Sequence, residues 1–347
     1  MRVLVAMSGG VDSSVAAALM AEAGHDVEGA TLKLWGGSSD SGCCSVADVD
    51  DARRVAQQLG IPHHVFNMTD HFADAVVDPY VAAHAAGRTP NPCIECNRHV
   101  KFDHLLHRAV RLGFDALATG HHARVDRAGP YRLLRGADPL KDQSYVLSML
   151  GQDHLARVLL PVGTMTKDAV RAHAARLGLR TAAKPDSQDV CFIHGADGRA
   201  GFLGRRLDLH PADVVDQSGA TVGAVDAVEL VTVGQRRGMG HGTDGRRRYV
   251  VAVDVPGRRV VVGGPDAAVT DAVVLDPATV TWVHHPLPPG SRAVAQVSAH
   301  GRPAACTVGP GPVVRFDVPQ RPVAPGQTVA LYDAVDPDAV VGAGIAA

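Results

Sequence analysis

The stretch that most constrains this chain is the glycine- and serine-rich segment 8–14, Ser-Gly-Gly-Val-Asp-Ser-Ser. It follows an apolar run at residues 3–7 that is typical of a buried strand. It precedes residues 15–23, whose alanine and leucine content favours a helix. Gly9 and Gly10 allow the backbone to approach a ligand closely. Serine hydroxyls and the free N–H groups of a helix start would donate hydrogen bonds to an anion. The segment therefore predicts a phosphate site between a strand and a helix.

This segment differs from a Walker loop, which requires G-x-x-x-x-G-K-[ST], because it contains no lysine. Its pattern, S-G-G-x-D-S, resembles the pyrophosphate loop of enzymes that cleave ATP between the α and β phosphates. We therefore expect ATP to be a cofactor.

The composition is that of an ordinary globular protein, with 347 residues, 46% hydrophobic residues and a net charge of −2. No apolar run reaches the roughly 18 residues of a membrane span. The first predicted strand directly follows Met1 and Arg2, so no signal peptide is expected. Six cysteines in a chain of this length do not make a disulfide scaffold, which favours a cytoplasmic setting. The near-neutral charge argues against indiscriminate nucleic-acid binding, although arginine pairs could form local basic patches.

The order of predicted elements indicates an α/β fold with a parallel, doubly wound sheet followed by β-rich domains. Strands alternate with helices up to about residue 205, so ligands are expected at the carboxyl ends of the strands. Beyond that point, short valine-rich runs separated by Gly, Pro and Asp predict a barrel or sandwich. We expect an ATP-binding catalytic domain at 1–205, a small central domain at 206–265 and a C-terminal β-barrel at 266–347.

Two constrained stretches separate the later elements. Residues 87–97 contain two prolines and are expected to form a rigid loop, with Asn97 capping a helix that runs to about residue 112. Residues 184–192 form a second constrained loop, which carries an isolated cysteine, Cys191.

Taken together, these segments resemble the tRNA-specific 2-thiouridylase family over nearly the whole chain. The matching motifs are residues 8–14, 87–97, 118–121, 141–144, 185–192 and 234–238. Other users of the same ATP loop, such as an amidotransferase or a ligase like argininosuccinate synthase, are not known to combine a C-x-x-C loop, a distant cysteine and a β-barrel tail. A non-catalytic nucleotide- or RNA-binding relative is the remaining alternative.

The resemblance implies an ATP-dependent sulfurtransferase that acts on wobble uridine 34 of tRNA. ATP adenylates the C2 oxygen and releases pyrophosphate; a persulfide sulfur then attacks C2, AMP leaves, and 2-thiouridine remains. The implied partners are the tRNAs for Lys, Glu and Gln and a sulfur donor, either a cysteine desulfurase or a persulfide relay protein.

The resemblance also assigns binding residues. Asp12 is expected to orient Mg²⁺ or the nucleotide. The positions that match ATP contacts are Ala6, Met7, Ser8, Gly9, Gly10, Val11, Asp12, Ser13, Leu32 and Gly120. The positions that match contacts with the target base or the tRNA are Asn91, Pro92, Cys93, His121, Lys141, Asp142, Gln143, Arg302 and Gln327. The family has a Tyr-Arg pair in the barrel where this chain reads His300-Gly301-Arg302, so only Arg302 is carried over.

For the sulfur chemistry, the resemblance assigns the persulfide to Cys191 and a partner role, with a disulfide in the cycle, to Cys96. A thiolate is the reactive form, and Arg98, Lys101 and Lys184 are near enough in sequence to provide positive surroundings. The remaining cysteines are expected to be ordinary small side chains: Cys43, Cys44 and Cys306.

Cys93 departs from the family, because many members have Asp at this position. Three interpretations remain open. Cys93 replaces Asp as a thiolate base. Alternatively, Cys93 and Cys96 hold zinc, although a closed site needs four ligands. In the third interpretation, Cys93, Cys96 and Cys191 hold a [4Fe–4S] cluster with one iron open to the incoming sulfur.

Overall fold

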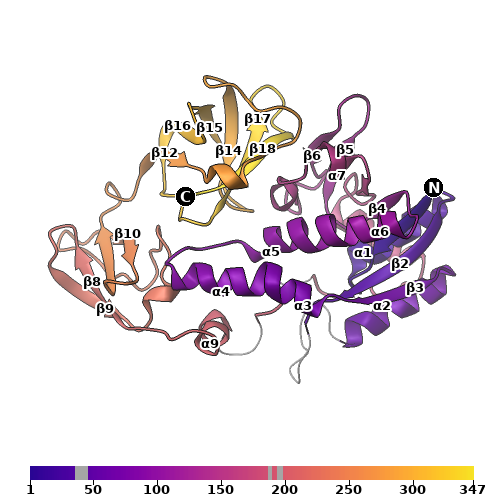
Figure 1. Ribbon diagram of the computed structural model, residues 1–347, viewed down its shortest axis with the longest axis horizontal. Coiled ribbons are helices and arrows are strands. Elements are labelled where there is room, and N and C mark those ends of the chain that lie inside the picture. Colours follow the sequence, from indigo (N-terminus) through magenta and orange to yellow (C-terminus); the bar gives the residue numbers. More distant parts are fainter. Residues whose placement is uncertain (36–45, 187–189, 194–197) are drawn as a thin grey trace.

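The computed structural model describes residues 1–35, 46–186, 190–193 and 198–347, and its elements form three sheets (Figure 1). The predictions for Cys43 and Cys44 concern residues outside these ranges. None of the described helices combines the length and the apolar character needed to cross a bilayer.

The first sheet is parallel and confirms the predicted fold class. Its five strands pair in the order β3-β2-β1-β4-β7, and the apolar runs of β1, β2 and β4 are buried because helices cover both faces. The strands are β1 (Arg2–Ala6), β2 (Asp26–Lys33), β3 (His63–Asn67), β4 (Ala116–Ala118) and β7 (Val158–Leu159).

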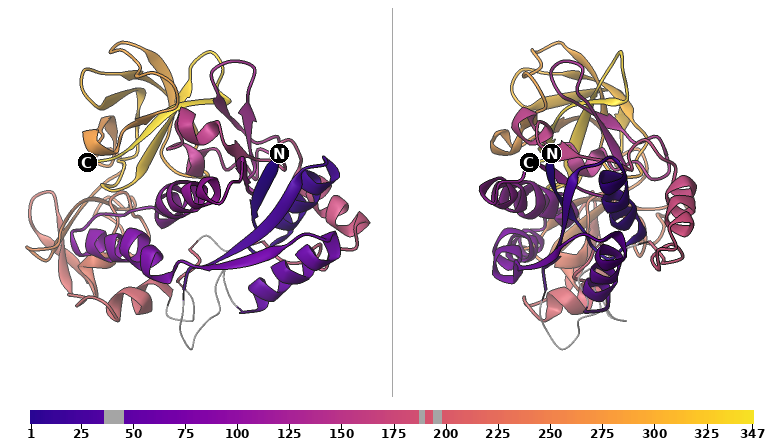
Figure 2. Two further views of the ribbon diagram at one scale, coloured as in Figure 1. Left: turned by 45° about the vertical axis from the view of Figure 1, so that its right-hand side comes forward. Right: turned by 90° about the vertical axis from the view of Figure 1, so that its right-hand side faces the viewer.

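Two groups of helices sandwich this sheet, as the right-hand view of Figure 2 shows. One group shares a core with one face: α1 (Val11–Glu22), α2 (Val46–Leu59) and α8 (Lys167–Arg176). The other group packs on the opposite face: α3 (Thr69–Phe72), η1 (Ala73–Val77), α4 (Asp78–Ala85), α5 (Pro92–Glu95), η2 (Cys96–Leu105) and α6 (Leu106–Arg111). The β1–loop–α1 turn therefore lies at the carboxyl edge of a doubly wound sheet.

The expectation that residues 87–97 form a loop throughout is wrong, because a helix begins at the second proline. Asn91 caps α5, and its side-chain oxygen accepts the backbone N–H of Cys93 at 3.1 Å. Pro92 takes the first helical position, where a missing N–H costs nothing. The helix continues through η2 into α6, so Asn97 lies inside it and caps nothing. Both cysteines of the C-x-x-C motif consequently lie on a helix.

The second and third sheets confirm the β-rich character of the rest of the chain. The second pairs in the order β10-β11-β8-β9, and the third in the order β12-β16-β15-β14-β17-β18-β6-β5, with β13 on β18. The strands of the second are β8 (Ala212–Asp216), β9 (Thr221–Val225), β10 (Tyr249–Asp254) and β11 (Arg259–Gly263). Those of the third from the C-terminal region are β12 (Thr270–Val274), β13 (Thr281–Trp282), β14 (Arg292–Gln296), β15 (Ala304–Val308), β16 (Val313–Gln320), β17 (Thr328–Asp333) and β18 (Ala339–Ile345).

Short elements complete the chain. After residue 144 the chain forms a single 3₁₀ turn, η3 (Tyr145–Leu147). The others are β5 (Ala123–Asp126), β6 (Arg132–Arg135), α7 (Gln152–Leu155), α9 (Gly198–Gly204), η4 (Val228–Leu230) and η5 (Pro277–Thr279).

The hairpin β5–β6 ties the first domain to the C-terminal sheet. Strand β6 pairs antiparallel with β18, and the guanidinium carbon of Arg135 lies 3.8 Å from the ring centroid of Tyr332. Nearby, the Tyr145 hydroxyl donates to the carbonyl of Thr328 at 2.9 Å, and the hydroxyls of Ser144 and Tyr332 lie 3.0 Å apart. The segment that carries the 141–144 motif is thus clamped between two domains.

Candidate nucleotide and thiolation site

The segment after β1 has the geometry of an anion-binding loop. Gly9 adopts φ +74°, and a side chain there would collide with the backbone carbonyl of Asp48, so only glycine fits. The Ser13 hydroxyl accepts the Ser8 backbone N–H at 3.1 Å and donates to the Gly10 carbonyl at 3.1 Å. Within the described part of the chain, no side chain caps the start of α1. Its first N–H groups therefore point to where an anion would bind.

Gly120 brings the end of β4 against this loop. A Cβ at this glycine would lie 2.6 Å from the backbone nitrogen of Ser13, so the two backbones touch. A cleft of about 420 Å³ opens beside them. The predicted residues that line it are Ala6, Met7, Ser8, Asp12, Ser13, Leu32, Gly120, His121, Lys141, Asp142 and Gln143. Of the other predicted ATP contacts, Gly9 and Gly10 shape the loop, and Val11 is buried beneath it in the helix core.

Asp12 is at the centre of a charged network in the cleft. The Lys167 ammonium donates to its two carboxylate oxygens at 2.8 and 2.7 Å, and His122 Nε2 lies 3.0 Å away. Burial alone would raise the pKa of Asp12, but hydrogen bonds with His122 and Lys167 outweigh it and hold the pKa below its ordinary value. Asp12 is therefore a carboxylate in this cleft at neutral pH.

The network continues to Asp186, in the second constrained loop. Lys167 contacts its carboxylate at 2.9 Å, Lys141 at 2.8 Å and Arg171 at 2.7 Å. Burial would raise the pKa of Asp186, yet the two lysines outweigh it and lower the pKa. Cations that line the cleft therefore hold Asp186, which lies five positions before Cys191 in the sequence.

Lys167 is a residue of this network that the sequence analysis missed. Lys167 is one of only five lysines and opens α8 directly after β7, at the carboxyl edge of the sheet. A rare lysine that follows a strand at the carboxyl edge of a parallel sheet could have marked Lys167 as a ligand-site residue. Lys184, expected near the cysteines, instead donates to the Gly9 carbonyl at 3.0 Å and to Asp48 at 2.6 Å. It fastens the loop.

The two neighbouring histidines and the 141–144 motif form the opposite wall. His121 is almost fully buried, and burial lowers its pKa well below the ordinary value, so its ring is neutral. The Gln143 side chain accepts the His122 backbone N–H at 2.9 Å. Asp142 accepts from the Arg135 guanidinium at 2.8 Å and from the Gly136 backbone at 2.9 Å, so its carboxylate organises its own loop.

The cysteines assigned to sulfur chemistry lie outside this lining. Cys96 belongs to the apolar core under η2, and Cys191 packs against the same core. Among the described residues no disulfide bond joins them. Phe192 anchors the Cys191 segment, with its ring centroid 5.5 Å from that of Tyr80. Cys306 is buried in the barrel, and burial raises its pKa to about 11, in keeping with an ordinary core side chain.

The predicted tRNA contacts near the C-terminus have different surroundings. Gln327 donates to the backbone carbonyl of Thr89 at 2.7 Å, and the Thr89 N–H donates to the Pro325 carbonyl at 2.7 Å. The last turn of the barrel is thereby fastened to the segment that leads to Asn91. Arg302 is exposed on the barrel surface.

Comparison with known proteins matches all three sheets. Residues 1–195 match a tRNA methyl transferase HUP domain, residues 200–264 a tRNA methyl transferase PRC-barrel domain, and residues 276–346 an aminomethyltransferase beta-barrel domain. The chain is 47% identical over 359 residues to the tRNA-specific 2-thiouridylase MnmA of Roseiflexus castenholzii, with 96% of each chain covered. The chain belongs to the tRNA-specific 2-thiouridylase family.

A second member of this 2-thiouridylase family, from Mycobacterium avium, is 47% identical over 350 residues, covering 97% of this chain and 96% of that one. The domain descriptions refer to methyl transfer, whereas the relatives that match over full length are named thiouridylases. A U34-tRNA thiolase from Methanococcus maripaludis, solved with a [4Fe–4S] cluster, is 19% identical with a TM-score of 0.37 and covers 59% of this chain and 65% of that one. So distant a likeness says nothing about a cluster in the present chain.

Proposed function

We propose that this chain uses ATP to replace the C2 oxygen of the wobble uridine of tRNA with sulfur. Family membership supplies the reaction class. ATP use is supported by the cleft beside the β1–α1 loop. The cleft is lined by the ammonium-bearing Lys141 and Lys167 and lies beside the start of α1, which no described side chain caps. The proposed domains are 1–205, 206–265 and 266–347. The proposed location is the cytoplasm, where tRNA is available as the substrate.

In the first step, the loop and the lysines would bind the pyrophosphate that leaves ATP. Lys167 and Lys141 carry the positive charge for it, and Asp12 and Asp186 are the carboxylates beside them that would hold Mg²⁺. No three His, Cys, Asp or Glu side chains form a metal site in the described ranges, which fits an ion held mainly by phosphate oxygens and water. Mg²⁺ would neutralise charge on the phosphates. The product is uridine adenylated at its C2 oxygen.

The target base would lie between the cleft and the start of α5. His121 is neutral and can hydrogen-bond a base without adding charge. Proposed contacts with the base or with the rest of the tRNA are Asn91, Pro92, Cys93, Lys141, Asp142, Gln143, Arg302 and Gln327. The tRNAs for Lys, Glu and Gln remain the proposed substrates.

In the second step, the terminal sulfur of a Cys191 persulfide attacks C2, and the C2–O bond breaks as AMP leaves. The Cys96 thiolate then attacks the Cys191 sulfur, the S–S bond to the product breaks, and a Cys96–Cys191 disulfide forms. A thiol reductant and a persulfide donor, such as a cysteine desulfurase or a relay protein, restore the enzyme. Cys93, in the first turn of α5, is the proposed acid–base group, since the positive helix end stabilises an anionic sulfur.

We propose the persulfide route, and a zinc or [4Fe–4S] centre held by Cys93, Cys96 and Cys191 is the alternative. Iron and acid-labile sulfide analysis after anaerobic purification decides the question. About four irons per chain, lost with activity in Cys93→Ala, would establish a cluster instead.

The experiment that tests the function measures pyrophosphate release and 2-thiouridine in purified tRNA with a persulfide donor. We expect the parent to do both and Cys191→Ser to release pyrophosphate without thiolation, because a hydroxyl cannot carry a persulfide. A chain that binds tRNA but never cleaves ATP would support a non-catalytic relative. ATP cleavage that depends on another acceptor would support a ligase or amidotransferase.

A further inference from the structure

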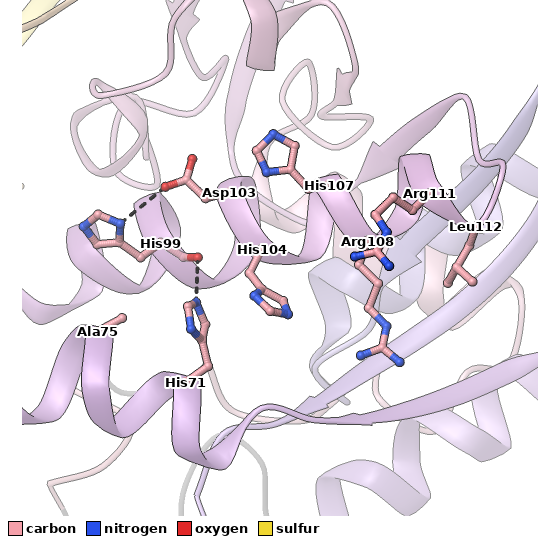
Figure 3. Close-up of a pocket in the computed structure, with 9 residues that line it drawn as sticks. All are labelled: His71, Ala75, His99, Asp103, His104, His107, Arg108, Arg111 and Leu112. Atoms are coloured by element: carbon pink, nitrogen blue, oxygen red, sulfur yellow. Dashed lines mark hydrogen bonds and ion pairs between the residues drawn. The ribbon is translucent and has the colours of Figure 1, made fainter.

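A second groove, of about 580 Å³, lies between α3–η1 and the outer face of η2–α6 (Figure 3). It shares no lining residue with the nucleotide cleft. Figure 3 shows His71 rising from the lower helix towards His104 on the upper one, and their ring centroids lie 4.4 Å apart. The lining residues are His71, Ala75, His99, Asp103, His104, His107, Arg108, Arg111 and Leu112. Four histidines and two arginines thus face a single carboxylate.

That carboxylate does not neutralise the arginines. Asp103 lies 3.3 Å from His99 Nδ1 and 3.1 Å from His154 Nε2, at one end of the groove. Arg108 and Arg111 are exposed and make no ion pair with any residue that the structure describes. The guanidinium carbon of Arg108 rests 4.2 Å from the centroid of the Phe66 ring. The other end of the groove is therefore cationic.

Some exposed arginines of this chain are neutralised by acids; Arg246, for example, pairs with Asp266 at 2.8 Å. Within the described ranges, Arg108 and Arg111 are not among them. Within the groove, burial lowers the pKa of His104, and the positive charges around it lower that pKa further. Net positive potential in a groove attracts anions, although the whole chain has a net charge of −2.

Two histidines and the two arginines of the groove form a stripe along one helical run. His104, His107, Arg108 and Arg111 have the spacing i, i+3, i+4, i+7, which brings side chains together on one helix surface. The stripe is roughly 10 Å long. It therefore spans about three phosphates of a nucleic-acid strand at roughly 3.4 Å of axial rise each.

We propose that this groove binds the phosphodiester backbone of the tRNA substrate through Arg108 and Arg111. The proposal rests on the proposed function, because the same helical run begins at Pro92 with the C-x-x-C motif, where the target base would lie. Arg108 lies 16 residues beyond Pro92 on this run, roughly 24 Å along the helix axis, so nucleotides several positions away from the target base are within its reach. Guanidinium groups without acidic partners match phosphate oxygens in charge and geometry.

The test compares tRNA affinity over a series of salt concentrations for the parent and for Arg108→Gln/Arg111→Gln. Losing two phosphate contacts should weaken binding about 10-fold to 100-fold at low salt. It should also reduce the slope of log K against log salt by about 1.5. Arg108→Lys/Arg111→Lys keeps both charges and should retain most of the slope. Arg53→Gln/Arg54→Gln removes the same charge from α2, on the opposite face of the sheet, and should change the slope little.

Each other outcome overturns the proposal. An unchanged slope in the glutamine variant excludes phosphate contact. A lower melting temperature with parental tRNA affinity would show that the arginines only favour the end of α6, since basic residues there stabilise a helix. Parental tRNA affinity with thiolation slowed only for a protein sulfur donor would assign the groove to that donor. Failure of the proposed function is distinct, because then the parent itself would not thiolate tRNA.

Discussion

Replacing Lys167 by glutamine tests the charged network most directly. The ammonium makes contacts of 2.8 and 2.7 Å with Asp12 and 2.9 Å with Asp186, and its side chain is 10% exposed. Leaving a buried charge without its partner costs about 3–5 kcal/mol. Asp12 is 30% exposed and keeps His122, and Asp186 is 36% exposed and keeps two cations, so we expect the low end, about 3 kcal/mol.

This loss should appear as faster amide hydrogen exchange in the first turns of α1 and α8, by about a hundredfold. Pyrophosphate release should fall about 10²-fold to 10³-fold, because a preorganised charge beside the phosphates is lost. Lys141→Gln is the matched control for stability: it pairs with Asp186 at 2.8 Å at an exposed position and should cost under about 1 kcal/mol.

The stabilisation that Asp12 gains from Lys167 should depend on pH in a definite direction. The folded pKa of Asp12 is lowered, so its ion pair stabilises fully above the unfolded pKa of about 3.9 and is lost as the pH falls through the folded value. The gap in exchange rate between parent and Lys167→Gln should therefore be constant from pH 5 to 7 and should close below about pH 4. Parental pyrophosphate release, or a gap that widens in acid, would refute the role given to Lys167.

Three further predictions follow from the packing. Gly120→Ala places a Cβ 2.6 Å from the Ser13 nitrogen, so ATP binding should be lost in calorimetry while thermal unfolding stays cooperative. Phe192→Ala removes a ring that is 5% exposed and should destabilise its segment by about 3 kcal/mol; thiolation should fall more than pyrophosphate release, and equal losses would contradict an anchoring role. Cys306→Ala should leave thiolation at the parental rate, and any loss of activity in a folded variant would show that this cysteine has a role.

The sheet and the nucleotide loop were predictable because their signals are local. Buried parallel strands are continuous apolar runs, and the anion loop is seven adjacent residues between a strand and a helix. The start of α5 was misjudged because proline breaks helices in their interior but favours their first position. The decisive residue was Asn91, whose capping oxygen lies just before Pro92.

What the sequence could not provide were pairings over long separations. Lys167 and Asp12 lie 155 positions apart, so no spacing rule connects them. The same holds for the hairpin β5–β6, a short stretch whose strand β6 pairs with β18 at the other end of the chain. Such contacts are specified by complementarity of charge and by sheet edges, which need the folded core to bring them together.

The network also couples the two halves of the site through one carboxylate. Asp186 stands in the loop that leads to Cys191, and two of its three cationic partners, Lys141 and Lys167, line the nucleotide cleft. A polyphosphate entering the cleft competes with Asp186 for both lysines, because it offers more negative charge at the same donors. Arg171, which does not line the cleft, keeps its contact of 2.7 Å and prevents complete release. In the proposed function, ATP in the cleft would therefore loosen the contacts of Asp186, which precedes the proposed sulfur carrier Cys191 by five positions in the sequence.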